Sequence, residues 1–487
     1  MLVPVFVKER LYVPRAPEFE QLLEELRSLF TYANPTYSKL KNLKKWTGSV
    51  PQQYKTWSHV STPDWGDCLT LPRGGTNRVR KVFDKYGLRP LFIDRRLSLP
   101  PITNLYNDVT LRPDQKRLVE VMLKIENCII RSPTGSGKTE VGLKLAELIL
   151  KVAGPVLVVV WDTNLLNQWI QRICKRFGIR ENQVGIIGKS KRRLAPITVA
   201  MQQTLLRQGH RYAHNFGGVI CDEIQRFAAP TFQEVIDYFS ARYRIGISAD
   251  ETRKDRKEFL IYDAFGEVAD EIEKASLVAE GKIHEVVVRI VPTMFNYEID
   301  LDVNGVRKSV EWNDIPPNLK DYNDFTDKLT HDEERNDLVW SFMEPCLRRN
   351  TCFVLTSRRE HVVYWDNRIR AAGYTSGVAM GGDEREFDRT IAGLKNRTIA
   401  AGVGTIGKGG TGHDIPQIDR GFVTVPLAGN KQLFGQVTGR FTRPCEGKTE
   451  AVVYYFWDQY CYPHHKNIIR RLYPETYVWI KDQFLPA

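Results

Sequence analysis

The chain has 487 residues, more than a single compact domain usually holds, and a prior of about 150 residues per domain predicts about three domains. Hydrophobic residues make up 42% of the sequence and charged residues 26%, a balance that excludes a largely disordered protein. The net charge of +12 favours an anionic partner, although a merely basic enzyme would carry the same charge.

The start of the chain and its cysteines indicate the compartment. Met1-Leu2-Val3-Pro4 is soon followed by charges at Lys8, Glu9 and Arg10, so no signal peptide is expected. No later run approaches the roughly 20 apolar residues of a membrane span. The eight cysteines form no C-x-x-C pair, which argues against a zinc site and a disulfide framework. We expect a cytoplasmic protein without a membrane partner.

Residues 1–108 are predicted to form a separate N-terminal domain, because they lack a phosphate loop and begin with a strand pair and a helix over Glu18–Phe30. The segment Lys39–Arg96 holds 13 Lys or Arg and 4 Asp or Glu residues. Such basic groups can neutralise phosphates, and aromatic rings such as Trp46 either stack on unpaired bases or form the core of the domain. The predicted duplex or junction contacts are Lys39, Lys41, Lys44, Lys45, Arg73, Arg78, Arg80 and Lys81.

Residues 109–290 alternate short β-branched runs with amphipathic stretches, which predicts a parallel sheet wrapped by helices. Residues 296–330 carry Asn, Asp and Pro turn residues and indicate a linker with a surface excursion. A second alternating block over Cys352–Phe456 predicts a second domain of the same class. The predicted strands are Cys128–Ile130, Val156–Trp161, Thr198–Ala200, Val219–Cys221, Arg244–Ile247, Phe353–Leu355, Gly421–Val425 and Val452–Phe456.

A phosphate loop follows the first of these strands and opens a helix. Its glycines let backbone N–H groups wrap the phosphates, Lys138 reaches the β- and γ-phosphates, and the Thr139 hydroxyl ligates Mg²⁺. The usual first Gly of the pattern is Ser132 here, a small residue that the loop tolerates. The loop predicts ATP as the cofactor and consists of Ser132, Pro133, Thr134, Gly135, Ser136, Gly137, Lys138 and Thr139.

Two adjacent carboxylates end the apolar strand that begins at Gly218. Asp222 is placed to hold Mg²⁺, and Glu223 is placed to orient or deprotonate the attacking water. Alone, such a pair is usually a solvated strand end. The phosphate loop upstream makes the catalytic interpretation the better one, so we predict an ATPase.

Asp222-Glu223-Ile224-Gln225 resembles motif II of the superfamily 2 helicases, and the other motifs of that superfamily follow in order over about residues 109–460. Leu111-Arg112-Pro113, Leu165–Trp169 and Thr252–Asp255 are most similar to the XPB group and to phage UvsW-type branch-migration helicases. The resemblance implies an α/β fold with two tandem RecA-like parallel-sheet domains and a smaller α+β N-terminal domain. It also implies movement 3′ to 5′ along DNA.

In the first RecA-like domain, the resemblance assigns residues to the nucleotide and to the strand. Leu111–Gln115 is similar to the Q motif, in which Gln115 reads the adenine edge and Arg112 lies close by. Gly246–Asp250 resembles motif III, with Asp250 in place of the usual Thr. The implied contacts with the nucleic-acid strand are Gln168, Trp169, Gln203, Thr204 and Arg253.

The second domain carries the remaining motifs of the resemblance. Val354–His361 looks like motif IV and Gly404–Pro416 like motif V, which the strand and the nucleotide share. Gln436–Arg443 matches motif VI, with arginines at i and i+3 on one helical face, which stabilise the transferring phosphoryl group. The implied strand contacts are Arg358, Thr405 and Thr411, the implied nucleotide contact is Asp414, and the implied catalytic groups are Gln436, Arg440 and Arg443.

The predicted domains are residues 1–108, 109–290 and 291–460, with a tail over 461–487 that packs on the last of them. Because the phosphate loop and the motif VI arginines lie on different domains, ATP is expected in a cleft that closes on binding and reopens on hydrolysis. We predict an ATP- and Mg²⁺-dependent DNA helicase or translocase that remodels forked or branched DNA in repair or recombination. The alternatives are an RNA helicase and a motor subunit of a larger repair, transcription or defence complex.

Overall fold

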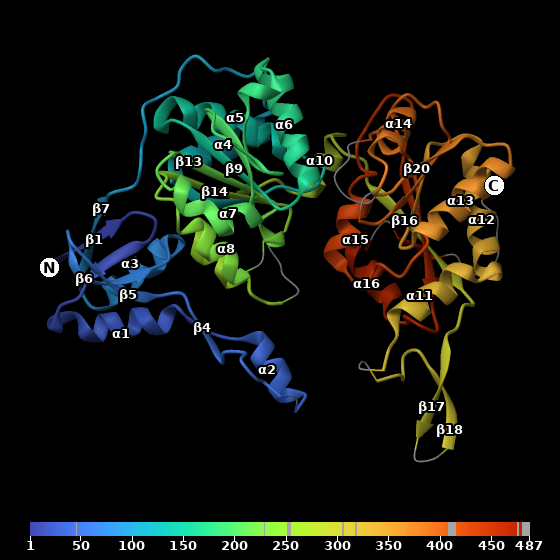
Figure 1. Ribbon diagram of the computed structural model, residues 1–487, viewed down its shortest axis with the longest axis horizontal. Coiled ribbons are helices and arrows are strands. Elements are labelled where there is room, and N and C mark those ends of the chain that lie inside the picture. Colours follow the sequence, from blue (N-terminus) through green and yellow to red (C-terminus); the bar gives the residue numbers. More distant parts are fainter. Residues whose placement is uncertain are drawn as a thin grey trace. The chain divides into compact units, whose positions relative to one another are not determined.

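The computed structural model describes residues 1–44, 46–227, 229–250, 255–303, 306–316, 319–407, 415–474 and 477–479. The chain divides into two compact units (Figure 1). The first comprises Met1–Pro133 and Gly137–Glu273, and the second comprises Thr134–Ser136 and Lys274–Ala487.

The N-terminal part of the first unit is a five-stranded sheet in the order β5-β6-β2-β1-β7, antiparallel except for the β1–β7 pair. Leu22 and Leu26 of one helix and Val79 and Phe83 of another lie fully buried in the core of this sheet. The strands are β1 (Leu2–Val7), β2 (Leu11–Pro14), β5 (Ser58–Thr62), β6 (Gly66–Leu71) and β7 (Arg89–Asp94), and the helices are α1 (Glu20–Leu29) and α3 (Thr76–Lys85). A separate strand pair, β3 (Thr31–Ala33) and β4 (Gln53–Lys55), carries α2 (Pro35–Asn42).

The remainder of the first unit is an eight-stranded sheet in the order β11-β10-β12-β9-β13-β14-β8-β15, parallel throughout except for the β10–β11 pair. The central strand β9 is buried at every residue, as expected for a parallel strand covered on both faces. The strands are β8 (Asn127–Arg131), β9 (Val156–Val160), β10 (Gly185–Gly188), β11 (Lys191–Arg193), β12 (Ile197–Met201), β13 (Gly218–Asp222), β14 (Tyr243–Ser248) and β15 (Val268–Glu271). The helices are α4 (Pro113–Ile125), α5 (Lys138–Ala153), α6 (Thr163–Phe177), α7 (Gln202–Gln208), α8 (Ala229–Ile236) and α9 (Glu258–Phe265).

A buried arginine joins these two sheets. Arg73 is 2% exposed and donates hydrogen bonds to Oδ1 of Asn127 at 2.8 Å and to the carbonyl oxygen of Ala241 at 2.7 Å. It also donates to the carbonyl of Lys8 on the N-terminal side at 3.2 Å. Burial lowers the pKa of this guanidinium well below its ordinary value. The prediction that Arg73 contacts nucleic acid is corrected, because its side chain is enclosed by protein.

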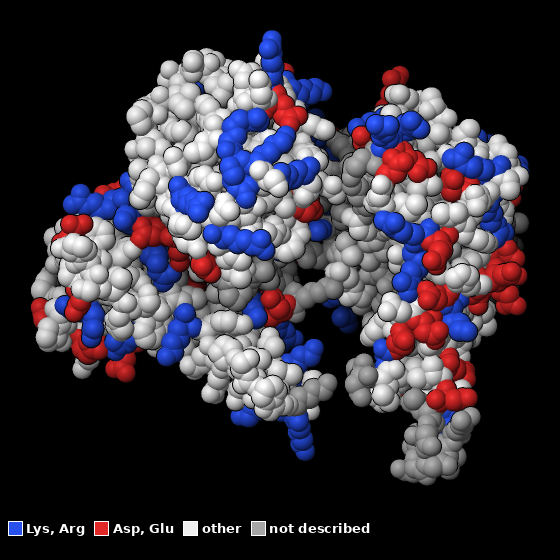
Figure 2. All heavy atoms as spheres, in the orientation of Figure 1, with Lys and Arg blue, Asp and Glu red and all other residues white. Residues whose placement is uncertain are grey.

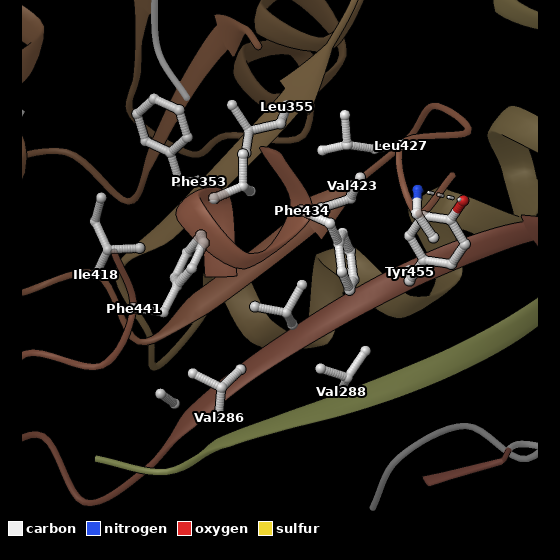
Figure 3. Close-up of a cluster of buried hydrophobic side chains, with 14 of the residues drawn as sticks. Val286, Val288, Phe353, Leu355, Ile418, Val423, Leu427, Phe434, Phe441 and Tyr455 are labelled. Carbon is white, nitrogen blue, oxygen red and sulfur yellow. Dashed lines mark hydrogen bonds between the residues drawn. The ribbon is translucent and has the colours of Figure 1, made fainter. Parts of the chain in front are cut away.

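The second unit is a seven-stranded sheet in the order β20-β21-β19-β22-β23-β16-β24, parallel throughout. Its core brings Val286 and Val288 of β16 together with Phe434 and Tyr455 (Figure 3). The strands are β16 (Val286–Thr293), β19 (Cys352–Thr356), β20 (Ser376–Ala379), β21 (Ala401–Thr405), β22 (Arg420–Val423), β23 (Ala451–Asp458) and β24 (Tyr477–Trp479). The helices are α10 (Lys274–Ala279), α11 (Tyr322–His331), α12 (Glu333–Leu347), α13 (Arg359–Ala371), α14 (Glu384–Lys395), α15 (Lys431–Thr438) and α16 (His465–Leu472).

The prediction of two α/β domains with parallel sheets is confirmed. The predicted boundary at residue 290 falls inside β16, which pairs along its whole length with β23, so the second sheet starts earlier in the chain. Within the predicted linker 296–330, the strands β17 (Glu298–Val303) and β18 (Val306–Glu311) form an antiparallel hairpin. Among the helices that the structure describes, none has the length and apolar character that a membrane crossing requires.

Candidate active site

The carboxyl ends of three neighbouring strands define the candidate site. In the order β13-β14-β8, Asp222 is in register with Ile247, and Ser248 is in register with Arg131. The phosphate loop, the acidic pair and motif III therefore leave the same edge of one parallel sheet. Ligands of open α/β sheets bind outside this edge, which makes it the place where chemistry is expected.

The phosphate loop has the backbone of an anion-binding turn. Gly135 and Gly137 have φ of 89° and 87°, in the left-handed region that side chains rarely adopt. Gly137 directly precedes α5, so Lys138 and Thr139 occupy the first turn of that helix. The loop is fixed at its other end, where the Ser132 amide donates to the Ser248 carbonyl at 2.8 Å. Free N–H groups at a helix start suit phosphate.

Gln115 of the Q motif lies against the phosphate loop. It is 4% exposed, and a Cβ atom built on Gly137 would lie 2.5 Å from its Nε2. Its Oε1 accepts a hydrogen bond from the Arg112 amide at 3.1 Å, while the Arg112 guanidinium donates to Asp114 at 2.8 Å. The backbone angle of Gly137 requires glycine, and the Gln115 side chain would have to shift to admit a Cβ atom there.

Lys138 reaches Glu223 across the edge of the sheet. Its Nζ donates to Oε1 of Glu223 at 2.7 Å, and the two side chains are 12% and 21% exposed. Burial favours the neutral carboxylic acid, but the Lys138 charge and hydrogen bond outweigh it, so the pKa of Glu223 is lowered. Glu223 is therefore held as a carboxylate, the form that a general base requires.

Asp222 is the more deeply buried carboxylate and is 4% exposed. Its Oδ2 accepts a hydrogen bond from Nε1 of Trp169 at 2.9 Å. Its Oδ1 is buried and has no hydrogen-bond partner among the described residues. Burial, and then the neighbouring charge of Glu223, raise the pKa of Asp222. The pKa values of Asp222 and Glu223 are thus shifted in opposite directions, so the two carboxyl groups at this edge of the sheet differ in how readily they hold a proton.

Two residues to which the sequence assigned no role connect motif II with motif III. Glu223 adopts a left-handed backbone with φ of 55°, a strained conformation for a residue with a side chain. Gln225 donates to its Oε2, and Ser248 donates from Oγ to Oε1 of Gln225 at 2.6 Å. Ser248 thereby orients the amide that orients Glu223. The sequence feature that could have indicated this chain of hydrogen bonds is Gln225, at the fourth position of motif II. Its contact with Ser248 is visible only in the folded structure.

The predicted strand contacts of the first unit do not share one environment. Trp169 is 1% exposed, which corrects its prediction as a strand contact, because a side chain enclosed in the protein and bonded to Asp222 cannot reach a strand. Gln203 is exposed and donates to the carbonyl of Trp161 at 2.9 Å. Gln168 and Thr204 are half-buried. Arg253 lies outside the described residues.

The predicted residues of the second unit lie on several elements. Thr405 ends β21, and Arg358 precedes α13 and donates to the carbonyl of Asn323 at 3.0 Å. Gln436 lies within α15, and Gln436, Arg440 and Arg443 are all half-buried. The prediction that the two arginines share one helical face is wrong, because α15 ends at Thr438, before both of them. Thr411 and Asp414 lie outside the described residues. Around Arg440, the Phe441 side chain is 2% exposed and anchors the motif in the core.

The predicted nucleic-acid residues of the N-terminal part also differ. Arg78 forms an ion pair with Asp263, a residue of α9 that is 0% exposed, and donates to Tyr32 OH at 2.7 Å. These contacts give Arg78 a role inside the protein, and its contact with nucleic acid stays a prediction. Arg80 is exposed and lies over the Phe92 ring at 5.4 Å. Lys44 is exposed, and Lys45 lies outside the described residues.

Comparison with known proteins finds relatives for the part of the chain that holds this site. A family model described as "Type III restriction enzyme, res subunit" matches residues 108–252, which hold the phosphate loop and both carboxylates. The probable helicase D10 of Escherichia phage T5 is 26% identical over 395 residues, 76% of each chain. The DNA 3'-5' translocase XPB2 of Sulfurisphaera tokodaii is 32% identical over 186 residues, 37% of this chain and 41% of that protein. The chain therefore resembles the superfamily 2 helicases, as its motifs predicted. These similarities support an ATP-dependent helicase enzyme.

A solved structure supports the fold of this helicase. The S. cerevisiae Dbp5 structure with RNA and ADP BeF3 aligns with 76% of this chain and 95% of that chain, with a TM-score of 0.50 and 12% identity. Likeness at this identity concerns the fold alone. The prediction of tandem RecA-like domains is confirmed. The resemblance to XPB and phage helicases, which the motifs predicted, is confirmed by the relatives above.

Proposed function

We propose that this helicase uses ATP hydrolysis to move 3′ to 5′ along DNA and to remodel forked or branched DNA in repair or recombination. The single observation that carries the ATP-hydrolysis part of the proposal is the Lys138–Glu223 contact of 2.7 Å at the carboxyl edge of the first parallel sheet. It brings the phosphate-loop amine and the general-base carboxylate to one point. This arrangement suits phosphoryl transfer to water, in which the protein contributes positioning and electrostatic stabilisation.

The residues of the site divide the work between binding and proton transfer. The phosphate loop from Ser132 to Thr139 binds the phosphates through backbone N–H groups and the Lys138 amine. Gln115, with Arg112 close by, reads the adenine edge. Glu223 accepts the proton of the attacking water, since its pKa is lowered and Gln225 fixes its second oxygen.

The residues present fit a magnesium ion. The buried Oδ1 of Asp222 lacks a partner among the described residues, and the Thr139 hydroxyl lies in the first turn of α5. No group of three or more His, Cys, Asp or Glu side chains suited to a metal occurs in the described ranges. Asp222 and Thr139 would hold Mg²⁺, which supplies charge neutralisation for the phosphates.

The second unit is proposed to contribute Gln436, Arg440 and Arg443 to hydrolysis, on the strength of the motif VI sequence. An arginine that neutralises the transferring phosphoryl group accelerates hydrolysis by about 10³- to 10⁵-fold, or roughly 4 to 7 kcal/mol of barrier. Asp414 is proposed to bind the nucleotide, and Arg358, Thr405 and Thr411 to bind strand phosphates. In the first unit, Gln168, Gln203, Thr204 and Arg253 are the proposed strand contacts.

DNA is proposed as the track for two reasons. The relative XPB2 is named a DNA 3'-5' translocase, and the chain carries a net charge of +12. A positive surface attracts the phosphate backbone and makes binding depend on salt. The test is ATPase stimulation by single-stranded DNA, blunt duplex, a fork, a four-way junction and RNA. The proposal predicts the highest rate with the fork or junction, and a highest rate with RNA would overturn it.

A second candidate is a motor subunit of a larger assembly. The matching family model describes the res subunit of type III restriction enzymes, which favours an ATPase that works beside other chains. The purified chain would then hydrolyse ATP weakly on every nucleic acid, and a partner protein would restore rapid hydrolysis. Full stimulation by DNA alone decides for the first candidate.

A further inference from the structure

The N-terminal part carries a basic projection, which we define as residues 35–50, namely α2 and the turn that follows it. It extends from the β3–β4 pair, away from the five-stranded sheet (Figure 1). From Leu26 to Pro63 the chain contains no Asp or Glu, whereas the projection contains Lys39, Lys41, Lys44 and Lys45. Figure 2 shows Lys and Arg but no Asp or Glu over α2. All the charged side chains of the basic projection are therefore positive.

The tip of the basic projection exposes an aromatic ring. Trp46 is 89% exposed and Leu43 is 55% exposed, whereas Trp169 and Trp312 are each 1% exposed. Trp46 follows the end of α2 by four residues, which span at most about 14 Å, so the ring lies close to the lysines of that helix. An isolated ring among basic groups matches a base flanked by phosphates.

The base of the basic projection is fixed, so the ring is presented on a rigid support. Asn34 is 1% exposed, accepts a hydrogen bond from the Thr36 amide at 3.0 Å and donates from Nδ2 to the Pro51 carbonyl at 2.7 Å. Next to it, Tyr32 stacks on Phe259 of α9 with ring centroids 4.1 Å apart. The projection is therefore tied to a helix that packs on the ATP-binding sheet.

We propose that the basic projection binds unpaired DNA, with Trp46 stacking on a base and Lys39, Lys41 and Lys44 neutralising adjacent phosphates. This inference deepens the proposed function and rests on it, because it names a surface for the DNA that the motor remodels. Stacking needs a base freed from its pair, so the surface discriminates a fork or a single-stranded end from intact duplex.

The test compares binding of the full chain to a fork with unpaired arms and to a blunt duplex of equal length. Trp46→Ala is expected to weaken fork binding by about tenfold, Trp46→Phe to retain most of it, and blunt duplex binding to change less than twofold. Changing Lys39, Lys41 and Lys44 to Gln should lower the log-log salt slope by about 2. Tyr106→Ala, which removes a ring 60% exposed elsewhere in the unit, is the matched control.

Three results would overturn the inference. The first is that Trp46→Ala binds the fork as tightly as the unaltered chain does. The second is that Trp46→Ala loses equal affinity for the fork and for the blunt duplex. The third is that Trp46 contributes to binding of anionic lipid vesicles or of RNA but not to binding of DNA. The DNA-stimulated ATPase of the unaltered chain is measured in parallel. If this stimulation is absent, the proposed function fails. If it is present and Trp46→Ala binds the fork normally, only the proposed role of the basic projection in DNA binding is excluded.

A second, independent observation concerns Lys448, a lysine that no motif includes. It is 6% exposed, and its Nζ donates to the carbonyls of Ile418 at 2.6 Å, Pro416 at 3.1 Å and Phe441 at 2.6 Å. Pro416 closes motif V, and Phe441 follows Arg440 directly in motif VI. One ammonium therefore ties the backbones of both motifs together.

We infer that Lys448 is a positioning residue, which acts through Arg440 by fixing the backbone next to it. This inference also rests on the proposed function, since it assumes that Arg440 promotes hydrolysis. Lys448→Met keeps the bulk of the side chain and removes all three donors. It is expected to lower kcat for ATP by about tenfold with KM changed less than twofold.

Non-additivity separates this role from a structural one. If Lys448 acts through Arg440, the double variant Lys448→Met with Arg440→Ala should hydrolyse ATP as slowly as Arg440→Ala alone. Leu394→Ala, a core change on α14, is the stability control. The inference would be overturned if the effects of Lys448→Met and Arg440→Ala on kcat multiplied in the double variant. It would also be overturned if Leu394→Ala, at the same loss of stability, lowered kcat as much as Lys448→Met. If Lys448→Met does not fold, Lys448→Arg is tested in its place. An unchanged kcat/KM in Lys448→Arg, together with loss of its non-additivity with Arg440→Ala, would count against the inference. If Arg440→Ala hydrolyses ATP normally, the proposed role of Arg440 in hydrolysis fails instead.

Discussion

Lys138 Nζ lies 2.7 Å from Oε1 of Glu223, so the amine that is proposed to bind the γ-phosphate is shared with the proposed general base. Phosphate must compete with this carboxylate for the same ammonium. Glu223→Gln removes the competing charge and the base together. We expect it to bind ATP about threefold to tenfold more tightly and to hydrolyse it at least about 10²-fold more slowly. A fluorescent ATP titration beside a phosphate-release assay checks both; weaker binding would contradict the competition.

Lys138→Ala tests the other half of the ion pair. It removes the cation that phosphate requires and leaves Glu223 buried without its partner, so both ATP affinity and hydrolysis should be lost. Lys144→Ala, a lysine of the same helix that pairs with Glu147, is the matched control and should retain ATP binding. Normal ATP binding by Lys138→Ala would remove it from the phosphate loop.

Trp169→Phe tests the hydrogen bond to Asp222. That bond favours the carboxylate, so its loss should raise the pKa of Asp222 further. Because protons and Mg²⁺ compete for the carboxylate, the Mg²⁺ concentration needed for half-maximal ATPase should rise as the pH falls, and it should rise at a higher pH in the variant. The measurement is a Mg²⁺ titration of the ATPase at several pH values. Identical pH dependence in both proteins would contradict the role of Trp169.

Asp263→Asn tests the attachment of the N-terminal part to α9. Asp263 is fully buried and accepts hydrogen bonds from Tyr32 at 2.9 Å and Thr56 at 2.6 Å besides its ion pair with Arg78. Removing its charge leaves Arg78 without compensation, which costs about 3 kcal/mol of unfolding free energy. Urea denaturation measures this loss. Glu25→Gln, which breaks the surface pair with Lys85, should change stability little.

Arg73→Met tests whether the two sheets of the first unit fold together. The substitution leaves the carbonyls of Ala241 and Lys8 without their donor, so the N-terminal part should detach more readily. We expect limited proteolysis between residues 95 and 110 to become at least tenfold faster. An unchanged cleavage rate would mean that Arg73 does not join the sheets.

The sequence predicted those features that are local. The phosphate loop needs glycine at 135 and 137 because of positive φ, and a strand that ends in Asp222-Glu223 is visible as an apolar run before two acids. Trp169 was misassigned because the sequence pattern of a helix does not distinguish an exposed tryptophan from one that donates a hydrogen bond to a buried carboxylate. Arg73 and Lys448 could not be predicted, because their partners are carbonyl groups that only the tertiary fold brings together.

The most direct test of the central claim is displacement of streptavidin from single-stranded DNA that carries biotin at one end. A motor that moves 3′ to 5′ should displace streptavidin from the 5′ end with ATP, and not with a non-hydrolysable analogue or in the Glu223→Gln variant. Displacement from neither end, or equal displacement without hydrolysis, would contradict an ATP-driven motor on DNA.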